Sequence, residues 1–202
     1  MPRLLLATTN QGKVAEYSYL FRGLPFEMVT PIDQGITVGV EEGDISMEEN
    51  ARHKAARYAE LSGLITVADD SGLEVEALGG EPGIRSARYA GEHASDRDRI
   101  EYLLGKLKEV PCEQRTARFR CVIAVAIPRG AVETCGGVCA GVIACEPKGE
   151  NGFGYDPIFY LPEFEKTMAE LPSELKNQIS HRARAAQKAC RVLERLAQKG
   201  TP

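Results

Sequence analysis

The stretch Leu64-Ile65-Thr66-Val67-Ala68-Asp69-Asp70-Ser71-Gly72 places two adjacent carboxylates directly after an apolar run. The apolar residues predict a short buried strand, and Ser71-Gly72 predicts a turn that follows it. Because open α/β sheets bind ligands at the carboxyl ends of their strands, we expect Asp69 and Asp70 to face a ligand. Mg²⁺ is the expected cation, since it takes one or two carboxylates together with phosphate oxygens. The alternative is that the two aspartates only cap a turn.

On both sides of this stretch the patterns predict a mixed α/β fold in one domain spanning residues 1–202. Ser46-Met47-Glu48-Glu49 and Ser95-Asp96-Arg97-Asp98 are typical of helix starts, and Pro128-Arg129-Gly130 indicates a hairpin turn. Glycine and proline predict a loop over 79–91. The expected strands cover residues 3–8, 26–30, 64–68, 73–78, 115–127 and 131–146. The expected helices cover residues 11–21, 46–61 and 181–198, with one more beginning at Ser95.

The composition is that of an ordinary globular protein, with 43% hydrophobic and 27% charged residues among 202 and a net charge of −4. This balance gives no support to a general nucleic-acid or membrane-surface binder, although a local basic cluster remains possible. The apolar run Leu4-Leu5-Leu6-Ala7 is too short for a signal peptide, so a cytoplasmic protein is expected. None of the six cysteines forms a CxxC pair, which argues against zinc. Reduced structural thiols are expected at Cys121, Cys139 and Cys190.

The segment Thr8-Thr9-Asn10-Gln11-Gly12-Lys13 joins the first expected strand to the first expected helix. Its hydroxyl groups, its backbone N–H groups and the positive end of the helix favour an anion such as phosphate. It lacks the spacing of a Walker loop. The alternative is that Thr9 or Asn10 caps the helix and Lys13 faces solvent.

Further charged residues lie near the helix that begins after Ser46. Glu41 and Glu42 precede it, and one of them could complete a magnesium site with Asp69 or Asp70. Lys54 lies two turns into the helix, where it could neutralise phosphate charge. The alternative is that these side chains are simply solvated.

Glycines flank the aromatic ring in Gly152-Phe153-Gly154-Tyr155-Asp156-Pro157, which indicates an open loop that presents Phe153. A planar base could stack on this ring, a contact that contributes about 1–3 kcal/mol and tolerates any base. The alternative is that Phe153 fills the core.

A basic cluster lies at the start of the last expected helix, where Ser180-His181-Arg182 follows Lys176. An arginine at a helix start opposes the helix dipole, a small cost that ligand binding could offset. His181 and Arg182 can donate hydrogen bonds to carbonyl oxygens of a base, and Lys176 can meet a base or a phosphate. The alternative is a solvated helix end.

Seven motifs run in order through nearly the whole chain. They are Ala7-Thr8-Thr9-Asn10-Gln11-Gly12-Lys13; Glu49-Asn50-Ala51 with Lys54-Ala55; Ala68-Asp69-Asp70-Ser71-Gly72-Leu73; Leu78-Gly79-Gly80 with Pro82-Gly83-Ile84 and Ser86-Ala87-Arg88-Tyr89; Gly152-Phe153-Gly154-Tyr155-Asp156-Pro157; Met168-Ala169-Glu170-Leu171; and Ser180-His181-Arg182. In these motifs and in their order along the sequence, the chain resembles the inosine triphosphate pyrophosphatase family, of the XTP/dITP diphosphatase type.

The resemblance implies hydrolysis of non-standard purine nucleoside triphosphates, such as ITP, dITP and XTP, to monophosphate and pyrophosphate with Mg²⁺. It also implies a homodimer and an elongated mixed β-sheet flanked by helices, with two lobes around a central nucleotide-binding cleft. Asp70 would be the catalytic acid–base carboxylate and a metal ligand, with Glu42 as the second ligand. The implied substrate contacts are Thr8, Thr9, Asn10, Gln11, Gly12, Lys13, Ser71, Phe153, Gly154, Tyr155, Asp156, Lys176, His181 and Arg182.

Two other functions compete with this expectation. A nucleotide-binding sensor would hold the triphosphate without cleaving it, as would follow if the aspartates were only turn formers. A related pyrophosphatase for modified pyrimidine nucleotides would share the phosphate and metal site but not the base contacts of His181 and Arg182. Pyrophosphate release from ITP separates the first of these from the hydrolase.

Overall fold

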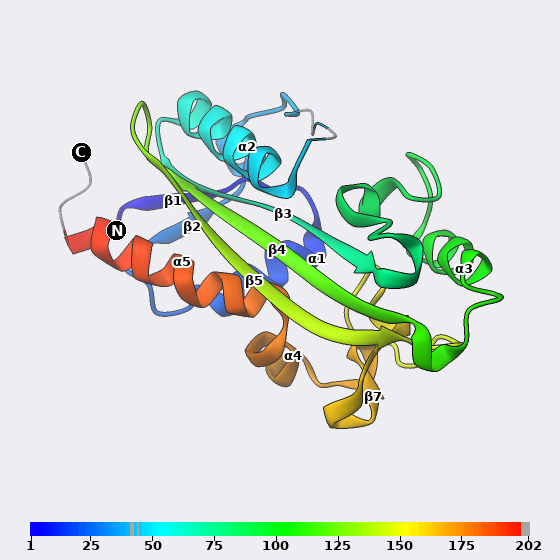
Figure 1. The fold of residues 1–202 in the computed structure, drawn as a ribbon. Coiled ribbons are helices and arrows are strands. Elements are labelled where there is room, and N and C mark those ends of the chain that lie inside the picture. The colour runs from blue at the N-terminus through cyan, green and yellow to red at the C-terminus, as the bar shows by residue number, and fades with distance from the viewer. Residues whose placement is uncertain (41–42, 44, 199–202) are drawn as a thin grey trace. The chain divides into compact units, whose positions relative to one another are not determined.

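The computed structural model describes residues 1–40, 43 and 45–198. Its described strands form a mixed sheet in the order β2-β1-β3-β4-β5-β6-β7, flanked by helices (Figure 1). The strands are β1 (Arg3–Leu6), β2 (Glu27–Val29), β3 (Ile65–Val75), β4 (Thr116–Ala126), β5 (Val132–Ile143), β6 (Phe159–Leu161) and β7 (Lys166–Thr167). The helices are α1 (Gln11–Leu20), α2 (Met47–Ser62), α3 (Asp96–Lys106), α4 (Ser173–Ile179) and α5 (His181–Gln198). The predicted α/β class is confirmed.

The first three helices begin where their capping residues were expected. The Asn10 side chain caps α1, and the Ser46 side chain caps α2. Ser95 and Asp98 form a reciprocal capping box at the start of α3. Gly63 ends α2 with φ of 66°, a left-handed conformation that glycine adopts without steric cost.

The strand that carries the two aspartates is longer than predicted, and the turn predicted at Ser71-Gly72 is wrong. β3 continues through these residues to Val75, and both Leu73 and Val75 are completely buried. Burial of these apolar side chains keeps the chain extended beyond Gly72. Asp69 and Asp70 therefore lie within a strand, where successive side chains point to opposite faces of the sheet.

The sheet combines parallel and antiparallel pairs. β1 pairs in parallel with β2 and β3, whereas β6 pairs antiparallel with β5 and β7. The predicted hairpin is confirmed: β4 and β5 are neighbours, and the Gly130 N–H donates to the Ile127 carbonyl in the turn. The short elements β6, β7 and α4 were not expected, because two to seven residues are too few to display a clear periodicity.

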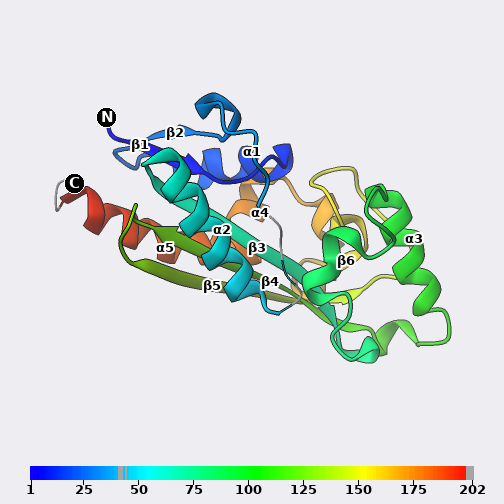
Figure 2. The ribbon, with the colours of Figure 1, turned by 90° about the horizontal axis from the view of Figure 1, so that it is seen from above.

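The chain divides into two compact units, and each has its own core. The first unit comprises residues 1–70, 121–137 and 182–202. Its core joins Leu4 and Val67 of the sheet to Tyr17 of α1 and to Ala189 and Leu193 of α5. The other face of β1 packs against α2, so α2 and α5 lie on opposite sides of the strands (Figure 1). Seen from above, α2 lies beside β3 (Figure 2).

The second unit comprises residues 71–120 and 138–181. Its core includes Leu103 and Leu107 from α3 and its continuation, together with Phe159 and Met168. The loop predicted over 79–91 is only partly irregular, because Gly83–Arg88 forms a 3₁₀ helix. The Ser86 hydroxyl in this helix accepts a hydrogen bond from the Leu73 N–H of β3, at 2.8 Å.

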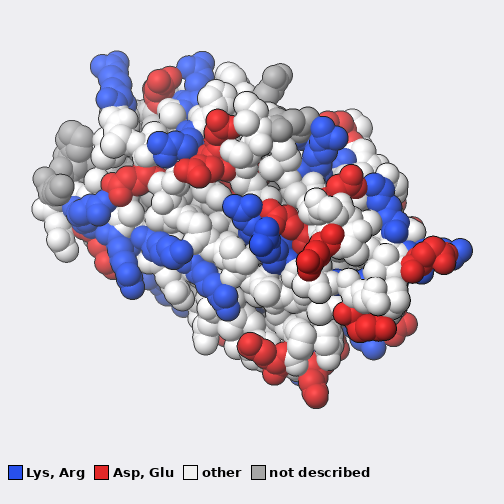
Figure 3. All heavy atoms as spheres, viewed as in Figure 1, with Lys and Arg blue, Asp and Glu red and all other residues white. Residues whose placement is uncertain are grey.

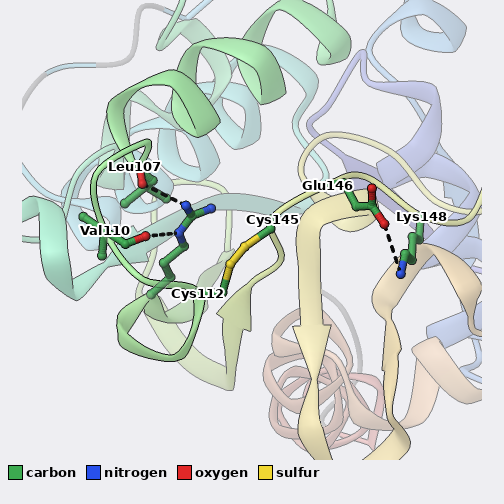
Figure 4. Close-up of a disulfide and its surroundings, with 7 residues drawn as sticks. Leu107, Val110, Cys112, Cys145, Glu146 and Lys148 are labelled. Carbon is green, nitrogen blue, oxygen red and sulfur yellow. Dashed lines mark hydrogen bonds and ion pairs between the residues drawn. A yellow bond between two sulfur atoms is a disulfide. The ribbon is translucent and has the colours of Figure 1, made fainter.

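A disulfide joins Cys112 and Cys145 within the second unit (Figure 4). The sequence did not indicate this pair, because the two residues are 33 positions apart and the fold alone brings their Cα atoms to 6.0 Å. Arg115 donates to the carbonyl oxygens of Leu107 and Val110 nearby. The expected free thiols are confirmed at Cys121, Cys139 and Cys190.

The exposed side of α5 carries a basic stripe. Arg184, Lys188, Arg191 and Arg195 are exposed at helical spacing, and basic side chains gather over this helix in Figure 3. Over the rest of the face shown, charges of both signs are scattered among uncharged residues. Within the described part of the chain, no helix combines the length and apolar character needed to cross a bilayer.

Candidate functional site

Asp69 is the centre of a buried cluster of charges in the first unit. The Lys13 Nζ donates to Asp69 Oδ1 at 2.9 Å, and the Arg182 guanidinium lies 3.4 Å from Asp69 Oδ2. The Lys54 Nζ donates to the Asp69 backbone carbonyl at 3.1 Å. Arg182 also donates to Glu16 Oε2 at 2.7 Å. The cluster thus joins the start of α1, α2, β3 and the start of α5 around one carboxylate.

These cations keep Asp69 ionised although it is 1% exposed. Burial by itself raises the pKa of a carboxyl group, because the charged form loses its hydration. The positive charges of Lys13, Arg182 and Lys54 outweigh this effect and hold the pKa of Asp69 well below its usual range. Burial and the Asp69 charge raise the pKa of the neighbouring Cys121 thiol to about 12, so this cysteine stays protonated.

Asp70 has a different environment on the opposite face of β3. Its Oδ2 accepts a hydrogen bond from the Asn50 Nδ2 of α2 at 2.9 Å. Asn50 also holds the backbone of Gly43, accepting from its N–H at 2.9 Å and donating to its carbonyl at 3.0 Å. The Asn50 amide therefore contacts Asp70 from α2, whereas Asp69 forms ion pairs with Lys13 and Arg182.

The segment 8–13 spans the connection that follows β1 and the first turn of α1. The Thr8 hydroxyl accepts from the Asn10 N–H at 3.2 Å, and the Asn10 side chain accepts from the Lys13 N–H at 3.0 Å. Thr9 and Gln11 are exposed and Gly12 is half-buried. Asn10 thus acts as the helix cap that the alternative interpretation anticipated, while the Lys13 side chain turns to Asp69 rather than to solvent.

A second group of predicted residues comes together in the second unit. Asp156 accepts hydrogen bonds from the Phe153 N–H, at 2.9 Å, and from the Lys176 Nζ. The Lys176 Nζ lies 4.8 Å from the centre of the Phe153 ring. Gly152 has φ of 79°, and a Cβ added there would collide with the Asp156 carboxylate. Asp156 therefore links the backbone of Phe153 to the buried Lys176.

The remaining predicted residues of the second unit have mainly internal contacts. The His181 ring stacks on Phe119, with centroids 4.6 Å apart, and is 5% exposed. The Tyr155 hydroxyl donates to the Ser86 carbonyl at 2.8 Å, and burial raises the pKa of Tyr155. Gly154 donates its N–H to Asp96 at 2.6 Å. Ser71 is half-buried in β3, directly after Asp70.

The donor chemistry at Asp70 fits Mg²⁺, because its carboxylate is a hard oxygen ligand and Mg²⁺ needs only one or two of these beside phosphate and water. In the ranges that the structure describes, no cluster of three or more His, Cys, Asp or Glu side chains could hold a metal by itself. The other predicted ligand, Glu42, lies outside the described residues, as does Glu41.

Residues 4–192 match the model of the Ham1 family. The chain belongs to the Ham1 family. It is 50% identical over 194 residues to the dITP/XTP pyrophosphatase of Desulforamulus reducens, covering 96% of each chain, and 47% identical over 194 residues to that of Bacillus subtilis, covering 96% and 98%. A HAM1 protein from Coxiella burnetii has a TM-score of 0.88 at 42% identity, covering 96% of this chain and all of the other. The Ham1 protein of Staphylococcus aureus has a TM-score of 0.85 at 44% identity, covering 95% and 98%.

Two residues of this Ham1 chain were not expected from its sequence as parts of the site. Glu16 is a buried carboxylate on α1, one turn after Lys13, and it reaches Arg182 across 166 positions of sequence. Asn50 stands within a motif of the family resemblance, but nothing in its residue type indicated contact with Asp70. The sequence held one indication for Glu16 and for Asn50, namely that each is a polar residue on the buried side of a helix.

Proposed function

We propose that this Ham1 protein hydrolyses the non-canonical purine nucleoside triphosphates dITP, XTP and ITP. Water and the triphosphate give the nucleoside monophosphate and pyrophosphate, with cleavage between the α- and β-phosphates. Membership of the Ham1 family and the names of the relatives support this reaction. The observation that carries the assignment of roles is that Asp69 is buried in ion pairs with Lys13 and Arg182, whereas the Asn50 amide holds Asp70 from α2.

Asp70 is the proposed catalytic carboxylate. A carboxylate is a hard oxygen ligand for a cation and can accept a proton from the attacking water. Mg²⁺, when bound by Asp70 and Glu42, would supply positive charge to the triphosphate oxygens. Lys13 and Lys54 would add to that charge, and the N–H groups of residues 8–13 would receive phosphate oxygens. Phosphoryl transfer depends on such positioning and electrostatics and needs no covalent nucleophile.

The residues proposed to recognise the base are Phe153, Gly154, Tyr155, Asp156, Lys176, His181 and Arg182, with Ser71 as a further substrate contact. The base would stack on Phe153, while Asp156 keeps Lys176 in place beside the ring. Hypoxanthine and xanthine carry an oxygen acceptor where adenine carries an amino donor, so side-chain donors would favour the former bases. Arg182 is one of these proposed donors. Its guanidinium is held in place by ion pairs with Glu16 and Asp69.

The experiment is a substrate panel with Mg²⁺, scoring monophosphate and pyrophosphate from dITP, XTP, ITP, dATP, dGTP and modified pyrimidine triphosphates. We expect rapid release from the first three only, no release in EDTA, and no turnover by a folded Asp70→Asn variant. Tight binding of dITP without pyrophosphate release would instead indicate a sensor. A preference for modified pyrimidines would contradict the base assignment.

We also propose that residues 1–202 work as a single catalytic domain, and that the protein is a cytoplasmic homodimer without nucleic-acid or membrane partners. The family resemblance in the sequence is the support for the dimer. Light scattering of the purified chain tests it, and a mass of one chain across the working concentration range would contradict it.

A further inference from the structure

Asn50 is buried and makes three hydrogen bonds that link three separate segments. It lies in the first turn of α2 and is 6% exposed. Its carboxamide pairs with both backbone groups of Gly43, at 2.9 and 3.0 Å, and its Nδ2 also donates to Asp70 Oδ2 at 2.9 Å. Burying an amide costs free energy unless its polar atoms are hydrogen-bonded, so the loss of any one of these partners would destabilise the arrangement.

The two bonds to Gly43 determine how the amide lies. An amide has one acceptor oxygen and two N–H donors. Gly43 takes the oxygen and one donor, so the direction of the other donor is fixed, and it points to Asp70. The two bonds to Gly43 do not require a glycine at that position. A Cβ added there would lie 3.6 Å from Asn50 Oδ1, which is an ordinary van der Waals distance.

We propose that Asn50 is a positioning residue that fixes the Asp70 carboxylate for cation binding. This inference rests on the proposed role of Asp70. The Nδ2 donor engages one carboxylate oxygen and restrains rotation about the Asp70 side chain, so the carboxylate is oriented before the cation arrives. Partners that orient a metal ligand in this way typically change metal affinity or activity by about 10- to 100-fold when they are removed.

The test uses the full nucleotide-free chain and Mn²⁺ alone, with affinity measured by electron paramagnetic resonance. Asn50→Leu keeps a similar side-chain volume and removes all three hydrogen bonds. The matched control is Tyr58→Phe, which deletes one neutral hydrogen bond from the same helix, to the Val38 carbonyl at 3.3 Å. We expect Asn50→Leu to weaken Mn²⁺ binding about 10- to 100-fold, and Tyr58→Phe to leave it within twofold.

A second measurement separates positioning from general support of the fold. In Asn50→Leu, the Mg²⁺ concentration for half-maximal hydrolysis should rise by the same factor, while the KM for dITP at saturating Mg²⁺ stays unchanged. In an Asp70→Asn background, Asn50→Leu should cause no further loss of Mn²⁺ affinity, because the two residues act as one unit.

The outcomes distinguish this inference from the proposal beneath it. If Asp70→Asn loses Mn²⁺ but Asn50→Leu binds it as the natural chain does, the positioning role is wrong and the role of Asp70 stands. If Asn50→Leu lowers the Mn²⁺ affinity by the same factor in the natural chain and in the Asp70→Asn background, the positioning role is also wrong. If Asp70→Asn retains full Mn²⁺ affinity, the proposed metal site itself fails and the inference fails with it.

Discussion

The substitution Arg182→Ala should destabilise the protein far more than a similar change elsewhere on α5. The Arg182 side chain is 2% exposed and lies between Glu16 and Asp69, which are themselves buried. Removing it leaves two carboxylates without this cation, and breaking a buried ion pair costs about 3–5 kcal/mol. At about 2–4 °C per kcal/mol for a chain of this size, the unfolding midpoint should fall by about 6–20 °C.

The control is Arg195→Ala on the same helix. Arg195 also pairs with a glutamate, Glu133, at 2.6 Å, but the two side chains are 49% and 45% exposed. An exposed pair contributes about 0–1 kcal/mol, so the midpoint should move by less than about 4 °C. Urea unfolding at pH 7 gives the free energy for both variants, and Arg182→Lys should recover part of the loss because it restores a charge. Equal losses in the two alanine variants would refute the reasoning.

Three further predictions concern other parts of the molecule. Phe153→Ala should weaken the binding of dITP and of XTP by similar factors of about 5- to 150-fold, because stacking contributes about 1–3 kcal/mol whatever the base. In steady-state kinetics, a loss confined to one of the two nucleotides would argue against stacking. Cys112→Ser, which removes the disulfide to Cys145, should cost about 2–4 kcal/mol in urea unfolding and make the midpoint insensitive to dithiothreitol. A variant still sensitive to the reductant would show that the disulfide is not responsible. The pKa of Asp69 is lowered in the folded protein, so its contribution is complete above the unfolded pKa of about 3.9 and is lost as the pH falls below it. Asp69→Asn should therefore flatten the decline of the free energy of unfolding between about pH 4 and pH 2, and parallel curves for the two proteins would contradict this account.

Local patterns were sufficient for much of the fold. Ser46 and Ser95 cap helices because their hydroxyl groups accept N–H groups only a few residues away, so the sequence alone contains both partners. The parallel pairing of β1 with β3 agrees with the predicted strand–helix order. The turn at Ser71-Gly72 was predicted wrongly because turn propensity is a local preference. The burial of Leu73 and Val75 against residues that are distant in the sequence outweighs it.

The sequence by itself determined the class of fold, the family resemblance and the residue types from which a phosphate and cation site can be built. Only the tertiary structure decided which partners each of those residues contacts. Asp69 and Asp70 are neighbours with the same side chain, yet the pleat of β3 points one toward the cations Lys13 and Arg182 and the other toward the amide of Asn50. Charge and hydration at a carboxylate depend on groups brought near it from remote parts of the chain, and no local pattern records those distances.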